Sequence, residues 1–234
     1  MNKNDNDFLK YIKNLEKYEL PTYNELPEIP LYMEQVVGYI NEVLNDLTQD
    51  SETTITPFMV NNYVKAKIIS SPVEKKYSKD NIGYLIAISI LKSVVSMKNM
   101  AVLIDIDEKV RTNTNNGDFE TLYSLFKKIE GESIKNVVRK VNARVEVIEK
   151  ASRNNKKNSK YSKEDEEKVN LAYIALRLYI ESEVNKLVAD NLMEYISKEV
   201  LPEEFLKEPK KAAKMDKKKT SVEAKKLADR QRRK

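Results

Sequence analysis

Glycine is the residue type that most limits how this chain can fold, because only four glycines occur among 234 residues. Folds built from many short strands need frequent tight turns, and such turns depend on glycine. Glycine-rich phosphate loops are equally disfavoured. Hydrophobic residues make up 41% of the chain, enough for a core, and charged residues make up 34%. We therefore expect a mostly α-helical protein with an extensive charged surface.

Cysteine and histidine are missing altogether. Their absence excludes disulfides, thiolate zinc sites, iron–sulfur clusters and cysteine nucleophiles, and it removes the commonest general base. We therefore predict that the protein is not an enzyme and has no metal site and no cofactor. Asp105, Asp107 and Glu108 are interpreted as solvated acids at a helix end, because residues two apart do not share a helical face.

The net charge of +5 is unevenly distributed along the chain. Residues 207–234 hold 13 basic and 4 acidic side chains, a local charge of +9, whereas the remainder carries −4. We predict a disordered basic tail there, which solubilises the protein, adds affinity for phosphate groups or touches anionic lipid. No apolar run is long enough to span a membrane, and the first residues do not resemble a signal peptide. We therefore expect a cytoplasmic protein without a membrane partner.

The first half of the chain shows a series of helix start signals. After a lead-in with three prolines, a helix should begin near Leu31 or Tyr32. Thr56 and Pro57 mark the next start, since a hydroxyl N-cap is followed by proline at the first helical position. This second helix is short and should end near Lys67.

A segment over residues 70–77 separates the short helix from the next one. Pro72 prevents a helix there, and the segment is long enough only for a small hairpin, or wing. Ser78 is the expected N-cap of a helix that is apolar on nearly all sides and therefore central to the core. Ser96 is the expected cap of a further helix.

The second half of the chain is predicted to form longer helices. We expect a loop and domain boundary over residues 111–118, helices over 119–130 and 133–151, a polar loop over 153–163 and a helix over 164–196. The predicted organisation is an N-terminal arm, a winged-helix domain, a helical effector or dimerisation region and a basic tail, over residues 1–17, 18–110, 118–206 and 207–234.

The order of the elements in the first half is that of a winged helix-turn-helix. In that fold the short second helix is the recognition helix, which enters the major groove of DNA. Residues 53–104 contain seven lysines against two acidic residues, a charge of +5 within an otherwise acidic body. The positive charge therefore lies where this fold would meet phosphates.

Four short segments carry a resemblance to the DNA-binding half of the MerR family. Asn61-Asn62-Tyr63 stands where the family has an Arg-Tyr-Tyr run, and Lys67-Ile68-Ile69 stands at its Gly-Leu-Leu turn. Lys76-Tyr77-Ser78 closes the wing, and Val95-Ser96-Met97 matches the start of the last helix. The sequence departs from the pattern where Asn replaces Arg, Asn replaces Tyr and Lys replaces Gly.

The chain more closely resembles a bacterial family of MerR-like proteins, the domain of unknown function DUF1836. The resemblance extends over residues 18–192, through YELPTYNELPEIPLYMEQVVGYI, ITPFMVNNYVKAKIISSPVEKKYSKDNIGYLIAISILK and the helix around residues 171–192. It implies a MerR-like winged helix followed by a helical C-terminal region, and a role in transcription.

The predicted DNA contacts lie on the short helix and the wing. Asn61 and Asn62 either contact base edges, as Asn does with adenine, or are solvated polar positions. Tyr63 either gives its hydroxyl to a phosphate or is a core tyrosine, and Tyr77 either touches DNA or fixes the wing to the core. The full set of predicted contacts is Thr56, Asn61, Asn62, Tyr63, Lys65, Lys67, Lys75, Lys76 and Tyr77.

The long helix predicted over residues 164–196 has an apolar stripe. The stripe either packs on the preceding helices or forms the seam of a homodimer, and a ligand pocket lined by Tyr173, Tyr179 and Met193 is a third alternative.

We expect a homodimeric transcriptional regulator that binds double-stranded DNA sequence-specifically, with an unknown small-molecule effector. The alternative is a non-catalytic module that keeps the winged-helix fold, lacks specific DNA binding and binds a protein or ligand. The departures from the MerR pattern at Asn61, Asn62 and Lys67 motivate this alternative.

Overall fold

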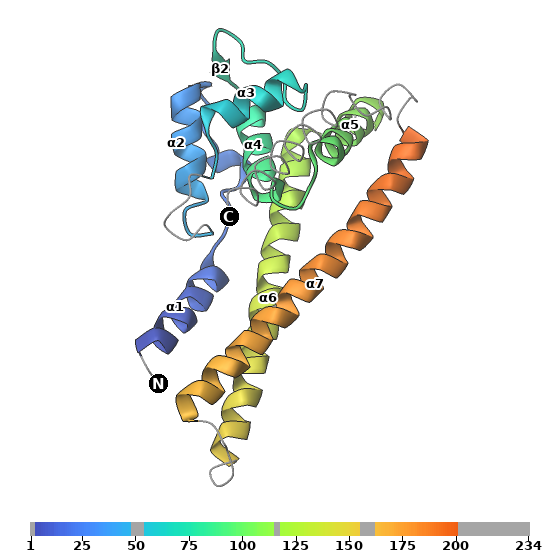
Figure 1. The fold of residues 1–234 in the computed structure, drawn as a ribbon. Helices are drawn as coiled ribbons and strands as arrows, with labels where there is room; N and C mark the ends of the chain where they lie inside the picture. The colour runs from blue at the N-terminus through green and yellow to red at the C-terminus, as the bar shows by residue number, and fades with distance from the viewer. Residues whose placement is uncertain (1–2, 48–53, 115–117, 155–161, 201–234) are drawn as a thin grey trace, which may run out of the picture. The chain divides into compact units, whose positions relative to one another are not determined.

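The structure is a computed structural model that describes residues 3–47, 54–114, 118–154 and 162–200. The predicted basic tail lies outside the described residues. The chain divides into two compact units, residues 1–193 and 194–234, and the description below concerns the first. The chain is mostly helical (Figure 1). The elements in chain order are α1 Lys3–Lys17, η1 Tyr23–Glu25, β1 Leu31–Tyr32, α2 Met33–Val43, α3 Pro57–Lys65, β2 Lys76–Tyr77, α4 Lys79–Leu91, α5 Met97–Thr114, α6 Phe119–Asn154 and α7 Lys163–Val200.

The predicted helix starts are confirmed at the positions where the sequence shows a cap. α3 and α4 begin directly after Thr56 and Ser78, and both side chains act as N-caps. Ser96 precedes α5, and its hydroxyl accepts a hydrogen bond from the backbone N–H of Asn99 at 3.1 Å. A cap satisfies an amide group that the first turn of a helix leaves unpaired, so it acts locally and can be recognised from the sequence.

Two expectations for the helical half are wrong. Residues 111–114, expected in a loop, are helical because α5 continues to Thr114. α6 is one helix of 36 residues, where two shorter helices were expected. It passes through Gly131, and the hydroxyl of Ser133 donates to the carbonyl oxygen of Ile129 at 2.7 Å. One glycine inside a helix costs only about 1 kcal/mol, which tertiary packing on both sides of it outweighs.

α4 lies at the centre of the larger hydrophobic core, which also contains residues of α2, α3 and the first turns of α6. A Cβ atom at Gly83 of α4 would lie only 2.6 Å from Cε1 of Phe119 and 3.1 Å from Cδ2 of Tyr123. The absence of a side chain at this position therefore allows the close approach of α4 and α6. Phe119 and Tyr123 are buried in this core, so the beginning of α6 shares a core with the segment that precedes it.

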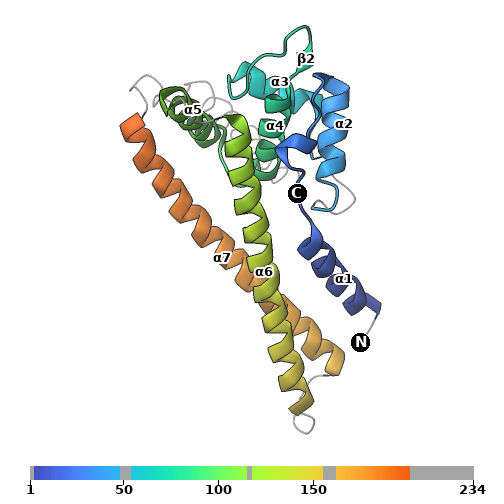
Figure 2. The same cartoon turned by 180° about the vertical axis from the view of Figure 1, so that it is seen from behind.

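A smaller hydrophobic cluster joins α1, α6 and α7. It consists of Ile12, Val138, Val141 and Ile174 with partly buried residues around them. The N-terminal segment forms the helix α1 and contributes Ile12 to this cluster. Figure 1 and Figure 2 show α6 extending from α4 past α1, with α7 crossing it. α6 therefore connects the two clusters.

Candidate nucleic-acid interface

The segment that leads into α3 is held in place by α2. The side-chain amide of Asn41 accepts a hydrogen bond from the backbone N–H of Ile55 at 2.9 Å and donates one to its carbonyl oxygen at 3.1 Å. Immediately afterwards, the hydroxyl of Thr56 accepts a hydrogen bond from the backbone N–H of Met59 at 3.3 Å. Thr56 thus starts the helix, and the clamp at Asn41 orients it. The sequence reasoning did not identify Asn41.

The predicted contact residues on α3 differ in exposure. Asn61 and Lys65 are exposed, and Asn62 is partly exposed. Asn61 and Lys65 are four residues apart, so they lie on the same helical face. Tyr63 belongs to the hydrophobic core with 5% of its surface exposed, and burial raises the pKa of its phenol. Its role in this fold is to anchor α3 to the core.

α3 ends in a Schellman motif. The backbone N–H of Lys67 donates to the carbonyl oxygen of Val64 at 3.0 Å, and that of Ile68 donates to the carbonyl oxygen of Tyr63 at 2.9 Å. The motif requires a left-handed residue, and Lys67 has a φ of 55°. Glycine usually occupies this position because it adopts positive φ without a steric penalty, so Lys67 holds a conformation that is less favourable for its side chain. The side chain of Lys67 is exposed beside the end of α3.

The wing predicted over residues 70–77 contains a two-residue hairpin turn. Val73 and Lys76 exchange backbone hydrogen bonds of 3.0 and 2.9 Å. The two residues between them, Glu74 and Lys75, have φ values of 49° and 66°. Positive φ at both central positions is the geometry that matches the twist of a hairpin. Lys75 therefore lies at the tip of the wing, where it is exposed.

The base of the wing pairs with an earlier part of the chain. β2 runs antiparallel to β1, with Tyr77 opposite Leu31 and Lys76 opposite Tyr32. The ammonium group of Lys76 lies 5.1 Å from the centroid of the Tyr32 ring. Tyr77 is only 2% exposed, and burial raises the pKa of its phenol. Tyr77 fixes the wing to the core, which was one of its two expected roles.

Some lysines in this positive region already have partners within the protein. Lys79 pairs with Glu28 at 3.5 Å and lies 4.5 Å from the centroid of the Tyr23 ring. The ammonium group of Lys92 donates to a backbone carbonyl oxygen. By contrast, the exposed lysines on α3, after α3 and at the wing tip make no ion pair within the described part of the chain, namely Lys65, Lys67 and Lys75.

Two exposed apolar side chains in this region were not identified from the sequence. Phe58, in the first turn of α3, is 72% exposed, and Val73, in the wing, is 77% exposed. Phe58 falls outside the apolar face formed by Met59, Val60 and Tyr63, and this mismatch with the helical period was the available signal. Large exposed apolar residues mark contact surfaces when they cluster, for nucleic acid as for protein.

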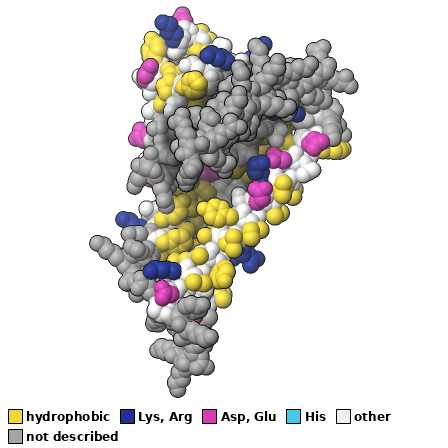
Figure 3. All heavy atoms as spheres, viewed as in Figure 1, with side chains coloured by type: hydrophobic (Ala, Val, Ile, Leu, Met, Phe, Trp, Pro, Cys, Tyr) yellow, Lys and Arg dark blue, Asp and Glu magenta, His cyan; other side chains and the backbone are white. Residues whose placement is uncertain are grey.

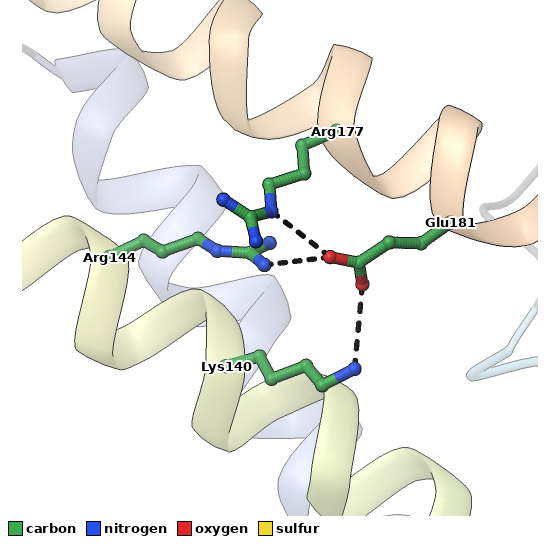
Figure 4. A network of polar contacts seen from close by, with 4 residues as sticks. All are labelled: Lys140, Arg144, Arg177 and Glu181. Atoms are coloured by element: carbon green, nitrogen blue, oxygen red, sulfur yellow. Dashed lines mark hydrogen bonds and ion pairs between the residues drawn. The ribbon is translucent and has the colours of Figure 1, made fainter.

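In the helical half, Glu181 of α7 has three basic partners (Figure 4). Its carboxylate lies 2.9 Å from Arg144 and 3.4 Å from Lys140, both on α6, and 3.1 Å from Arg177 on α7. Hydrogen bonds from Arg144 and then Arg177 lower the pKa of Glu181 to about 2. This network ties α7 to α6 and fixes which face of α7 points outwards.

Another side of α7 carries an exposed apolar stripe. Its members follow one another at steps of three or four residues, so they line one helical face. Each is between 45% and 66% exposed. This α7 stripe consists of Val169, Tyr173, Leu176, Ile180, Val184 and Leu187. Hydrophobic side chains form a band along α7 in Figure 3. The stripe offers on the order of 600 Å² of apolar surface, at the upper end of the range of about 300–600 Å² for the largest patch on a typical monomer.

The other sequence-based candidates lie in different surroundings. Tyr173 and Tyr179 are 66% and 76% exposed, so they do not line an enclosed pocket. The carboxylate of Asp105 pairs with Lys109 at 2.7 Å, and that of Asp107 accepts a hydrogen bond from the hydroxyl of Tyr84 at 2.9 Å. Within the described ranges, no group of three metal-ligating side chains comes together, and no helix has the length and apolar character of a membrane span.

The architecture defines the protein as a mostly α-helical one, with short capped helices and a two-stranded sheet preceding three long helices. Residues 21–126 match the family described as a domain of unknown function (DUF1836). The match spans the segment that runs from η1 to the first turns of α6, a little under half of the chain. Neither the curated proteins nor the solved structures include a match to this chain.

Proposed function

We propose that the protein is a sequence-specific regulator of transcription that binds double-stranded DNA through a MerR-like winged helix-turn-helix over residues 18–110. It is non-catalytic and acts in the cytoplasm as a homodimer. The observation that carries the proposal is the placement of exposed Asn61, Lys65 and Lys67 on and beside α3, together with Lys75 at the wing tip.

The proposed docking places α3 in the major groove. α3 has nine residues and is therefore about 14 Å long, comparable with the groove width of about 12 Å. Asn61, on the exposed face of α3, is the residue assigned to base edges, with Asn62 beside it. Lys65 and Lys67 are assigned to the phosphates at the C-terminal end of α3. Thr56, Tyr63 and Tyr77 orient the helix and wing and make no contact in this proposal.

The wing supplies the second set of phosphate contacts in this proposal. Lys75 extends from a hairpin turn whose backbone is closed by two hydrogen bonds, and Lys76 is held against the ring of Tyr32. The backbone of a short, closed turn loses little conformational freedom when one of its side chains binds. These residues therefore add affinity that depends on salt but not on DNA sequence.

Homodimerisation is assigned to the α7 stripe. A standard interface takes about 800 Å² from each partner, and the stripe with its flanking side chains approaches this area. A twofold pair of recognition helices requires such a seam, because the seam sets the spacing of the two half-sites on DNA. The stripe lies on a different side of α7 from the buried Ile174, so it remains available in a monomer.

The test is binding to genomic DNA fragments at two salt concentrations, for the full chain and for Asn61→Ala, Lys75→Ala and the control Lys10→Ala, an exposed lysine of α1. Asn61→Ala should lose about 1–3 kcal/mol of binding to the preferred fragments only. Lys75→Ala should weaken binding to all fragments and reduce the salt slope by about one. Uniform binding by every variant would overturn the proposal.

The exposed apolar residues favour a second candidate, a protein-binding module without specific DNA binding. Phe58 and Val73 are among the most exposed large apolar residues described, and they lie on the elements assigned to DNA. A protein partner would bury both. If no fragment is preferred, this candidate leads, and Phe58→Ser should then abolish capture of the partner without changing affinity for DNA.

A further inference from the structure

A cavity of about 340 Å³ lies between α6 and the segment that joins α1 to η1. Tyr18 and Leu20 form one wall, and Lys127, Glu130 and Lys135 of α6 are among the residues of the other. Its volume falls within the range of about 300–1,000 Å³ that small-molecule sites occupy. The cavity lies outside the surface that we assign to DNA.

Glu130 is unusual among the residues that line the cavity. Both oxygens of its carboxylate are buried, and neither has a hydrogen-bond partner among the described residues. Burial raises the pKa of this carboxyl group to about 7, and the ammonium group of Lys127 opposes the rise only in part. A buried carboxylate without a donor destabilises a fold, so its presence on a packed face requires another explanation.

The neighbouring protein groups do not supply the missing donor. The hydroxyl of Tyr18 already donates to the carbonyl oxygen of Val43 at 3.1 Å. The hydroxyl of Tyr123, also buried, has no hydrogen-bond partner in the described part of the chain. The next inward-facing residues of α6 are Ile134 and Val138, which are apolar and belong to the cluster shared with α1 and α7. Glu130 is therefore a charged residue at a core position beside an open cavity.

The residues that line the cavity carry charges of both signs. The carboxylate of Glu130 lies buried at the wall, which favours a cationic group that donates hydrogen bonds. Lys127, Lys128 and Lys135 line the same cavity, and they favour an anionic group. Glu19 and Glu132 also line it, so the site is not uniformly basic and a simple anion is disfavoured.

We propose that this cavity binds a small zwitterion of the amino-acid type, with its ammonium group on Glu130 and its carboxylate among Lys127, Lys128 and Lys135. The ammonium group supplies the donors that Glu130 lacks, and the lysines hold the opposite end. Because residues on α6 and on the segment after α1 line the cavity, the ligand links these two parts of the chain. The site does not depend on the proposed DNA binding.

The experiment measures the melting temperature of the full chain with each common amino acid, at a pH above 7 where Glu130 is ionised. The variants are Glu130→Gln and the matched control Glu146→Gln, an exposed glutamate of α6 that pairs with Lys150. A ligand that binds only the folded state raises the melting temperature in proportion to its occupancy. We expect at least one amino acid to do so for the unmodified chain and for Glu146→Gln, and none for Glu130→Gln.

Folding is controlled within the same experiment, because Glu130→Gln removes a buried charge and should melt no earlier than the unmodified chain without ligand. Lys135→Met should raise the Kd of the amino acid that stabilises the unmodified chain tenfold or more. The corresponding amine without a carboxylate should bind the unmodified chain and Lys135→Met equally weakly. The proposal is overturned if no amino acid raises the melting temperature of the unmodified chain, or if Glu130→Gln responds as Glu146→Gln does.

Discussion

The α2–α4 region and the α6–α7 pair differ in how completely they bury their apolar side chains. Around α4, residues such as Ile82, Leu85 and Ile86 are fully buried. Along α7, the stripe that includes Leu176, Ile180 and Val184 is about half exposed. The first region buries its hydrophobic surface within one chain. The second retains apolar surface that water contacts unless a partner covers it.

This difference indicates how stability and function are divided in the molecule. The α2–α4 region has a closed core, so its exposed polar and basic residues can be changed with little effect on folding. The α7 stripe contributes to stability only after association, because its side chains are hydrated in the monomer. Substitutions in the two regions should therefore affect different measurements.

The largest effect is expected at the stripe. Ile180→Glu places a charge at the centre of the proposed seam and should weaken self-association by two orders of magnitude or more, about 3 kcal/mol. Sedimentation equilibrium measures the dissociation constant. Val147→Glu, at an exposed apolar residue of α6 outside the stripe, is the control and should leave association unchanged. If the unmodified chain is monomeric at all concentrations, the α7 stripe is not a homodimer seam, and association does not distinguish the two regions.

The next effect concerns the close approach of α4 and α6. Gly83→Ala introduces a Cβ atom 2.6 Å from the ring of Phe119, so the rings must shift, and we expect a loss of about 1–3 kcal/mol in the free energy of unfolding. Gly38→Ala in α2 is the matched control, because nothing lies within 4 Å of its Cβ position. It should stabilise by up to about 1 kcal/mol. Urea denaturation of both variants compares them, and equal effects would contradict tight packing at Gly83.

The pH dependence of stability should report the buried carboxyl group of Glu130. Its pKa is raised from 4.5 to about 7 in the folded state. A raised pKa means that this group favours folding most below its unfolded pKa, and that the contribution is lost as pH rises through the folded pKa. Glu130→Gln should flatten the pH profile between these values and stabilise by about 1–2 kcal/mol at higher pH, after allowance for solvent screening. An unchanged profile would show that Glu130 is solvated.

The smallest expected effect separates stability from binding within the first region. Lys67→Gly relieves the left-handed backbone at the end of α3 and should stabilise by up to about 1 kcal/mol. The same change removes a proposed phosphate contact and should reduce the salt slope of DNA binding by about one. A variant that is more stable and binds DNA with an unchanged slope would exclude Lys67 from the interface.

The local elements could be predicted because their causes are local. Thr56, Ser78 and Ser96 cap helices through hydrogen bonds to residues three positions away. The two-residue turn of the wing was expected only as a small hairpin, because neither Glu74 nor Lys75 is a residue that usually adopts positive φ. The continuity of α6 through Gly131 was missed, because a weak local signal for a break was outweighed by packing at distant positions.

The candidate site shows the same division. Its exposed residues, among them Asn61 and Lys75, were identified from the order of elements and the local charge. The burial of Tyr63 and Tyr77 was left open, because a tyrosine at a helical or strand position has the same local pattern whether its hydroxyl points to solvent or not. The clamp from Asn41 to Ile55 joins residues 14 positions apart in the chain, and no periodicity marks it.

The sequence by itself determined the helical class, the capped starts of α3, α4 and α5 and the excess of lysine around α3. These properties follow from composition and from interactions within one or two helical turns. Only the tertiary structure decided that Gly83 admits the ring of Phe119, that Glu130 is buried beside a cavity and that the α7 stripe faces outwards. Each of these depends on which side of a helix meets another helix, and that is set by contacts between residues far apart in the chain.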